Sequence, residues 1–246
     1  MKRSINIVLL AMTLTATATF LSASDQKDKK TTGSKVVDSG SFGIFMSGKR
    51  VGTETFHIEQ RADLSVATSE IKVDDGKFKA TQTSEMQITA KGELRSYNWR
   101  STLPQKEESS VEAKDQLLVE HVVPADQKKM DVPHVLPLST VILDDNFFSH
   151  REILVWRYLA TGCLLKNNER LCGPSSFGIL VPQQHVAASV SVELVGRDKL
   201  LVKGVEQEVN KVRMESEGIV WMLWVGDDYK VMKMAVPANN VEVVRD

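Results

Sequence analysis

The sequence is poor in cysteine, has almost no net charge and contains no long hydrophobic run beyond its N-terminal segment. It has 2 cysteines, and 31 basic residues are balanced by 32 acidic ones. No later stretch approaches the ~20 apolar residues that a membrane-spanning helix needs. A chain without net charge has no field that attracts nucleic acid or anionic lipid. We therefore expect a soluble mature protein that binds no nucleic acid and has no membrane span.

The N-terminal segment has the order of a secretory signal. Lys2 and Arg3 precede the apolar stretch Ile5–Phe20, and small residues follow it. Such a segment is too short and too weakly apolar for a membrane helix and is typical of a cleaved signal peptide. We predict a signal peptide over residues 1–24, a polar, flexible linker over 25–40, and a periplasmic or secreted protein.

The two cysteines, Cys163 and Cys172, predict a disulfide bond. Export would place the chain in an oxidising compartment, where neighbouring cysteines bond each other. A metal site is disfavoured because no histidine stands at ligand spacing, and a redox pair because the C-x-x-C spacing is absent. The short loop between them would restrict the unfolded chain by about 2.7 kcal/mol.

Most of the chain reads as long antiparallel strands separated by tight turns. Asp75-Gly76 is a strong hairpin signal, because both residue types tolerate positive φ. Apolar Met86 and Ile88 alternate with polar neighbours, as in a sheet with one packed and one wet face. Long twisted strands tend to curl. We predict a mainly β fold over 41–246: a curled antiparallel meander, half-barrel or barrel, with one helix covering it.

That helix is expected over His150–Thr161, inside an insert spanning residues 144–172. Ser149 and Glu152 have the spacing of a capping box, in which each side chain bonds the other residue's amide. Gly162 is suited to the left-handed position that ends many helices. The apolar residues of the helix cover more than half its circumference, which predicts broad burial against the sheet.

Known catalytic signatures are missing, so we expect no enzyme, no metal and no cofactor. There is no H-E-x-x-H, no phosphate-binding glycine loop and no dinucleotide fingerprint, and Gly173–Gly178 has the wrong spacing for a nucleophile elbow. The 5 histidines are scattered along the chain. A hydrolase would require the fold to bring His121 or His150 together with Glu152 in one cleft.

The tryptophans indicate where a ligand could bind. Trp221 and Trp224 have opposite parity in one expected strand, so one should face the inside of the curled sheet and the other its outside. A curled sheet of this size can leave an interior wider than its side chains fill. We predict that Trp99, Trp156 and Trp221 line an apolar pocket with the helix as its lid; the alternative is ordinary core packing.

The first and last predicted strands resemble those of an uncharacterised exported bacterial β-protein family. The residues that carry this resemblance are Phe42–Phe56, with Gly48 and Val51-Gly52, and then Trp224–Lys230, Met234–Pro237 and Val241–Val243. That family is similar to the half-barrel fold of periplasmic lipoprotein carriers. The resemblance implies a curved antiparallel sheet with a helical cover, and it brings no catalytic residues. The insert 144–172 is not part of the family pattern.

Two functions follow from this interpretation. The first is an exported, soluble binding protein for an apolar or amphipathic ligand, such as a lipid or a lipid-modified chain. The alternative is an envelope structural or protein-interaction module without a small-molecule ligand, whose partner is another envelope protein bound through an edge strand or loop. A hollow interior favours the first, and a fully packed one favours the second.

Overall fold

The computed structural model describes residues 34–115, 117–124, 128–166 and 169–246, with the backbone alone described for 165, 166, 169 and 170. The predicted signal peptide 1–24 and the first part of the predicted linker, 25–33, lie outside the described residues. The end of the linker was placed wrongly. The first strand already begins at Lys35 and its residues pair with the second strand, so a segment that looks polar in sequence is ordered by a neighbour in the sheet.

One 15-stranded sheet dominates the described residues. The elements in chain order are β1 (Lys35–Met46), β2 (Lys49–Arg61), β3 (Leu64–Asp74), β4 (Lys79–Thr89), β5 (Leu94–Leu103), β6 (Glu107–Lys114), β7 (Leu117–Val123), β8 (Met130–His134), β9 (Val141–Ile142), α1 (Ser149–Thr161), β10 (Cys163–Lys166), β11 (Glu169–Cys172), β12 (Ser175–Val181), β13 (Val186–Val202), β14 (Val205–Ser216), β15 (Ile219–Val225), β16 (Val231–Val236), the 3-10 helix η1 (Pro237–Asn239) and β17 (Val241–Arg245).

The sheet consists of two meanders, which are joined through the first and the last strand of the chain. Strands β1–β8 form one meander and β12–β17 the other, and β1 pairs antiparallel with β17. The short β9 pairs in parallel with β12, so the sheet ends at β8 on one side and at β9 on the other. The predicted fold class, a curled and mainly antiparallel β meander with one helix, is confirmed; among the described strands the sheet does not close into a barrel.

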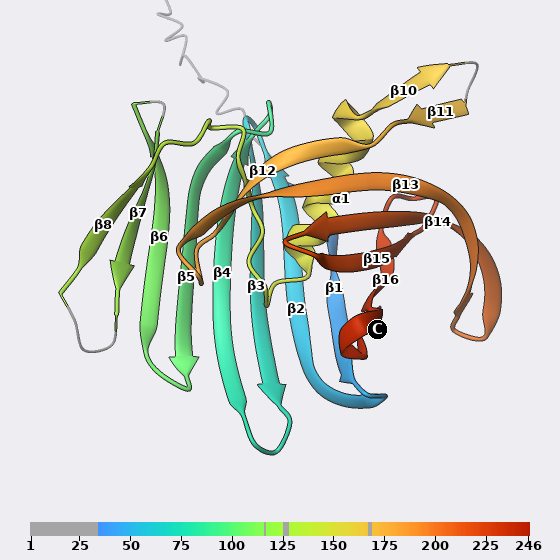
Figure 1. The fold of residues 1–246 in the computed structure, drawn as a ribbon, viewed down its shortest axis with the longest axis horizontal. Helices are drawn as coiled ribbons and strands as arrows, with labels where there is room; N and C mark the ends of the chain where they lie inside the picture. Colours follow the sequence, from blue (N-terminus) through green and yellow to red (C-terminus); the bar gives the residue numbers. More distant parts are fainter. Residues whose placement is uncertain (1–33, 116, 125–127, 167–168) are drawn as a thin grey trace, which may run out of the picture. The chain divides into compact units, whose positions relative to one another are not determined.

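Helix α1 lies between the two meanders and supplies much of the core. Figure 1 shows β12–β15 crossing the strands of the first meander, with α1 seen between them. Leu154, Val155 and Tyr158 of the helix are fully buried, in one cluster with inward side chains of both meanders such as Phe42 and Leu223. The helix therefore holds the two halves of the sheet together through apolar burial. Among the described residues, no helix is long and apolar enough to cross a bilayer.

The helix occurs where it was predicted, and the interactions at its two ends differ from the prediction. Ser149 and Glu152 do not form a capping box: no side chain caps the first turn from the N-cap position, which is Phe148. Gly162 has φ −95°, which is not left-handed. Glycine is required there for space, since a Cβ would lie 2.5 Å from the Ser175 hydroxyl and 2.9 Å from the Tyr158 ring.

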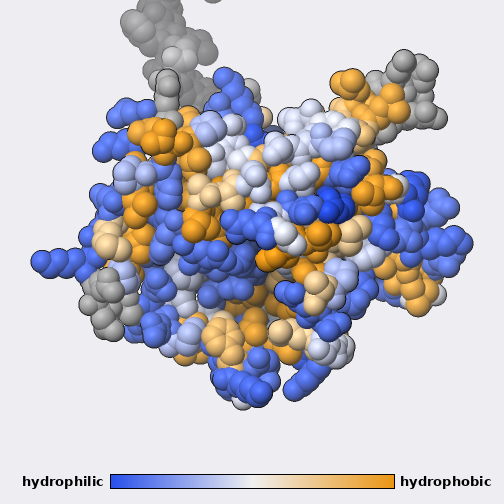
Figure 2. Space-filling model, in the orientation of Figure 1, coloured by the Kyte–Doolittle hydropathy of each residue, from blue (hydrophilic) through white to orange (hydrophobic). Residues whose placement is uncertain are grey.

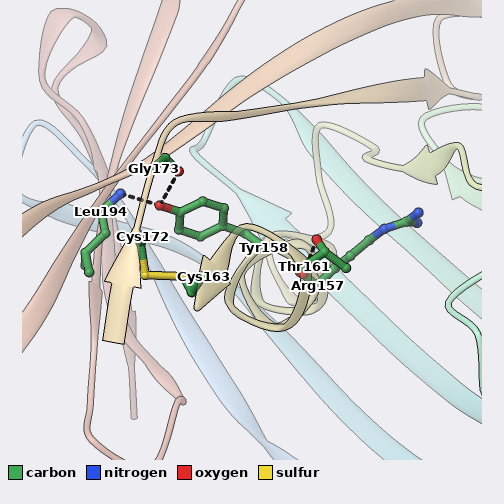
Figure 3. The surroundings of a disulfide bond; sticks show 7 residues. All are labelled: Arg157, Tyr158, Thr161, Cys163, Cys172, Gly173 and Leu194. Atoms are coloured by element: carbon green, nitrogen blue, oxygen red, sulfur yellow. Dashed lines mark hydrogen bonds between the residues drawn. A yellow bond between two sulfur atoms is a disulfide. The ribbon is translucent and has the colours of Figure 1, made fainter. Parts of the chain in front are cut away.

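The predicted disulfide bond between Cys163 and Cys172 is present and closes the β10–β11 hairpin directly after α1. The Tyr158 hydroxyl lies beside it, donating to the carbonyl of Gly173 (3.0 Å) and accepting from the amide of Leu194 on β13 (2.9 Å), as Figure 3 shows. The end of the helix is thus tied to both the hairpin and the second meander.

Candidate ligand-binding site

The start of α1 is fixed by a carboxylate from the sheet. Glu54 of β2 is fully buried and accepts from the amide of Phe148 (2.7 Å), the amide of Ser149 (3.2 Å) and the Ser149 hydroxyl (2.7 Å). Burial raises the pKa of Glu54, and the hydrogen bonds from Ser149 oppose that rise. A negative group at a helix N-terminus satisfies amides that otherwise lack partners. Glu54 therefore caps the N-terminus of the helix, in place of the predicted capping box of Ser149 and Glu152.

Glu152, also in the first turn of α1, pairs with a cation that is mostly buried. Arg245 of β17 donates from Nη2 to both oxygens of Glu152 (2.9 and 2.7 Å) and to Asp38 of β1 (2.9 Å). Burial raises the pKa of Glu152 well above its usual value, against the attraction of Arg245. The pKa of Asp38 is lowered: burial works against this, and hydrogen bonds with Glu152 and Arg245 prevail. Together these contacts lock the helix to the β1–β17 joint.

Arg151 lies in the same helical turn, between Ser149 and Glu152 in sequence. Its charge is not paired with a carboxylate of the described residues. Arg151 is 4% exposed, and Nη1 donates to the carbonyls of Asp144 (3.1 Å) and Phe147 (3.3 Å). Its guanidinium carbon lies 4.1 Å from the centre of the Trp221 ring. No carboxylate of the described residues comes within ion-pair distance of it. Burial lowers the pKa of Arg151 to about 10, so the side chain remains cationic at neutral pH.

Arg151 and Trp221 line a cavity of about 250 Å³, which we call the Arg151 pocket. It lies on the inner face of the second meander, beside the start of α1, and the side chains around it are mostly apolar. They include Leu143, Ile179, Val181, Ala188, Val190, Met214, Val236 and Val241. Its rim carries exposed Val186 and Ile219 together with the polar residues Asp145, Gln184, Ser216, Glu217 and Asn239. The pocket therefore combines an apolar wall with a single cation.

The three tryptophans predicted to share a cavity do not do so. Trp221 lines the Arg151 pocket. Trp156 lies on the other side of the helix, in a hollow of about 330 Å³ with Val37 and Tyr229, and its indole donates to the Tyr229 carbonyl (2.8 Å). Trp99 is 5% exposed on the first meander, and its indole nitrogen has no hydrogen-bond partner in the described part of the chain. It is among the residues that line a separate groove of about 770 Å³.

A larger groove, of about 770 Å³, lies along the first meander, mainly on the face that points away from α1, and we call it the outer groove. Thr55 and His57 line it, and they alternate along β2 with the inward side chains Glu54 and Phe56. Most of the residues that line it are polar or charged, among them Thr68, Glu70, Thr83, Glu85, Asn98, Arg100, Glu108, Ser110, His121 and Lys129, and Phe56, Trp99 and Val123 line it as well. A polar, open groove of this kind does not suit the apolar ligand that the sequence analysis predicts.

The residues considered for a hydrolase lie apart. His150 is buried against Tyr97 and Phe147, and burial lowers its pKa to about 3. Glu152 is paired with Arg245 as described above. His121 lies at the outer groove, where its Nδ1 is 2.7 Å from Asp131.

Sequence reasoning also missed the buried carboxylate of Glu120 on β7. It accepts from the Ser109 hydroxyl (2.8 Å) and lies within hydrogen-bond distance of His134 Nε2 (3.0 Å) and His185 Nδ1 (2.8 Å). Because His185 stands in the turn before β13, this cluster ties the first meander to the second. Within the described residues no group of three histidine, cysteine or acidic side chains could hold a metal ion.

Comparison with known proteins shows a likeness in fold. No protein-family model matches the chain, and no curated protein matches its sequence. The crystal structure of a β-barrel-like protein, from the domain of unknown function DUF1849 of Brucella abortus, is similar with a TM-score of 0.53. The match covers 85% of this chain and 94% of that one, at 8% sequence identity. The two proteins share a fold. An uncharacterised β-barrel-like family thus offers the same architecture, and at this identity the likeness concerns the fold alone.

Proposed function

We propose that the protein is an exported binding protein for an amphipathic ligand, a lipid or a lipid-modified chain, whose apolar part occupies the Arg151 pocket. The observation that carries the proposal is the pocket itself: an inner cavity walled by aliphatic side chains, with Trp221 and one guanidinium in it. Ligand sites commonly have this composition, a mostly apolar lining with few polar groups. The predicted signal peptide and the disulfide bond support export, because disulfides persist in oxidising compartments.

The size of the pocket limits what it holds. At roughly 30 Å³ for a water-sized group, about 250 Å³ accommodates on the order of eight such groups. This suits a short alkyl chain or one end of a longer one. Exposed Val186 and Ile219 at the rim would cover the part of a longer chain that leaves the pocket.

A pair of neighbouring alanines on β13 provides the test. Ala188 lines the pocket, whereas Ala187 is exposed on the other face of the same strand. Fluorescence titration with dansyl-octylamide is expected to show binding to the wild-type chain. Ala188→Phe should weaken it by at least about tenfold by filling the cavity, and Ala187→Phe should leave it unchanged. Absence of binding to the wild type, or equal binding by both variants, would refute the proposal.

A second candidate function, interaction with an envelope protein, is favoured by one observation. Leu164 and Leu171 face each other across the β10–β11 hairpin and are 75% and 53% exposed. Figure 2 shows hydrophobic atoms at this hairpin, at the upper right of the molecule. If the hairpin docks on a partner, chemical cross-linking in intact cells should give a discrete adduct that Leu164→Ser with Leu171→Ser removes. An unchanged adduct, or none, would exclude this role.

A further inference from the structure

We infer that the ligand has a carboxylate at its buried end and that Arg151 binds this carboxylate through its free edge. The inference rests on the proposed function and specifies its ligand class. It starts from the way the guanidinium is held. Nη1 is occupied by the carbonyls of Asp144 and Phe147, while Nε and Nη2 donate no hydrogen bond to any described residue.

The unused nitrogens are accessible. Trp99 Nε1 and Thr140 Oγ1 are the fully enclosed side-chain polar atoms without a partner in the described part of the chain. Nε and Nη2 of Arg151 are not among them, and Arg151 lines the pocket. These two nitrogens form one edge of the guanidinium, with parallel N–H groups that match the two oxygens of a carboxylate. Arg151 therefore has a bidentate edge without a partner among the described residues, on a side chain that lines the cavity.

The acidic groups near Arg151 are hydrogen-bonded to other residues, so the guanidinium can still pair with an anionic ligand. A buried cation without a paired anion is costly, so a site of this kind gains from a negative ligand. The nearest acidic groups that attract it are Asp145, Glu54 and Asp144. Asp145 bonds Gln184 at the rim, and Glu54 is committed to the helix N-terminus. Asp144 accepts from the Gln183 amide and from the Tyr97 hydroxyl.

The rest of the lining distinguishes a carboxylate from other head groups. Arg151 is the sole lysine or arginine among the pocket residues. One guanidinium edge satisfies a planar two-oxygen anion, whereas a phosphate would bury a third charged oxygen against aliphatic side chains without a donor. A quaternary ammonium beside the guanidinium would be repelled by it, whereas the carboxylates of Asp145 and Glu217 lie at the rim of the pocket. The Trp221 ring, whose centre lies 4.1 Å from the guanidinium carbon, adds a cation–π contact that favours one orientation of the guanidinium.

The experiment compares three ligands that share an eight-carbon chain and differ in the head group. Isothermal titration calorimetry of the full chain with octanoate, octanol and octyltrimethylammonium should show octanoate binding about 10- to 100-fold more tightly than octanol. The ammonium should bind most weakly. Arg151→Met should remove the preference for octanoate while octanol still binds, and Arg151→Lys should restore part of it, since an ammonium lacks the planar fork.

A control variant and the titration of the wild-type chain with the same ligands separate the carboxylate inference from the proposed function. Arg157→Met alters an arginine of the same helix that donates to the Gly92 carbonyl and does not line the pocket, so it should keep the preference. If Arg151→Met fails to fold, the wild-type series still decides. Octanol or the ammonium binding as tightly as octanoate would overturn the carboxylate while leaving the proposed function standing. If neither these ligands nor dansyl-octylamide bind, the proposed function itself fails.

Discussion

Asp144 should give this protein a pH dependence that a single substitution exposes. Its carboxyl is fully buried, and burial raises its pKa from 3.8 to about 7. Between these values the folded chain holds a proton that the unfolded chain has released. The free energy of unfolding therefore falls as pH rises, by about 1.4 kcal/mol per pH unit and about 4 kcal/mol in all, and the effect levels off above pH 7.

His150 works in the opposite direction over nearly the same range. Burial, with a smaller contribution from the charge of Arg151, lowers its pKa from 6.5 to about 3. Between these values the unfolded chain binds a proton that the folded chain does not, so the free energy of unfolding rises with pH, again by about 1.4 kcal/mol per unit. In the wild type the contributions of Asp144 and His150 nearly cancel from about pH 4 to 6.5.

Asp144→Asn removes the contribution of Asp144 and leaves that of His150. Asparagine can still accept from the Gln183 amide, as the aspartate does at 3.0 Å. Urea unfolding between pH 4.5 and 7.5 should then show a slope of stability against pH that exceeds the wild-type slope by about 1.4 kcal/mol per unit below pH 6.5. Asp227→Asn, whose carboxylate is 74% exposed, is the control and should parallel the wild type. Parallel lines for Asp144→Asn as well would refute the reasoning.

Substitutions at three further sites test the anchors of the helix. Cys163→Ser with Cys172→Ser should lower the free energy of unfolding by about 2.7 kcal/mol in urea titrations, because a crosslink between residues nine apart no longer restricts the unfolded chain; an unchanged midpoint would contradict this. Arg245→Met should cost about 3–5 kcal/mol, since buried Glu152 loses its cation, and Arg245→Lys should recover part of the loss. Glu54→Ala should cost about 2 kcal/mol and speed hydrogen exchange in the first turn of α1, and unaltered exchange there would argue against its capping role.

The strands and turns could be predicted because their signals are local. Gly76 has φ +90° in the turn expected from Asp75-Gly76. Trp221 and Trp224 do face opposite sides: the first lines the inner pocket, and the second donates to Asp198 and lies 5.4 Å from the ammonium of Lys233. Alternation along a strand decides the face of each side chain.

The site could not be predicted, because its contacts join distant parts of the chain. The spacing of Ser149 and Glu152 fits a local cap, yet Ser149 bonds Glu54, 95 residues away, and Glu152 bonds Arg245, 93 residues away. Hydrogen bonds with these tertiary partners outcompete a weak local motif. The parity of Trp99 places it on the inner face, but the curvature of the sheet sets which cavity that face borders. Nothing in the sequence singles out Arg151.

The joint between β1 and β17 has a consequence for folding. The Ser41 hydroxyl bonds Asp246 across 205 positions of sequence, so uniting the two meanders means closing a loop of that size. Such a closure carries an entropic cost of about 5 kcal/mol on the scaling for flexible loops. Each meander can form from its own local hairpins before β1 pairs with β17. We expect the pairing of β1 with β17 to be the last part of the sheet to form and the first to be lost on unfolding.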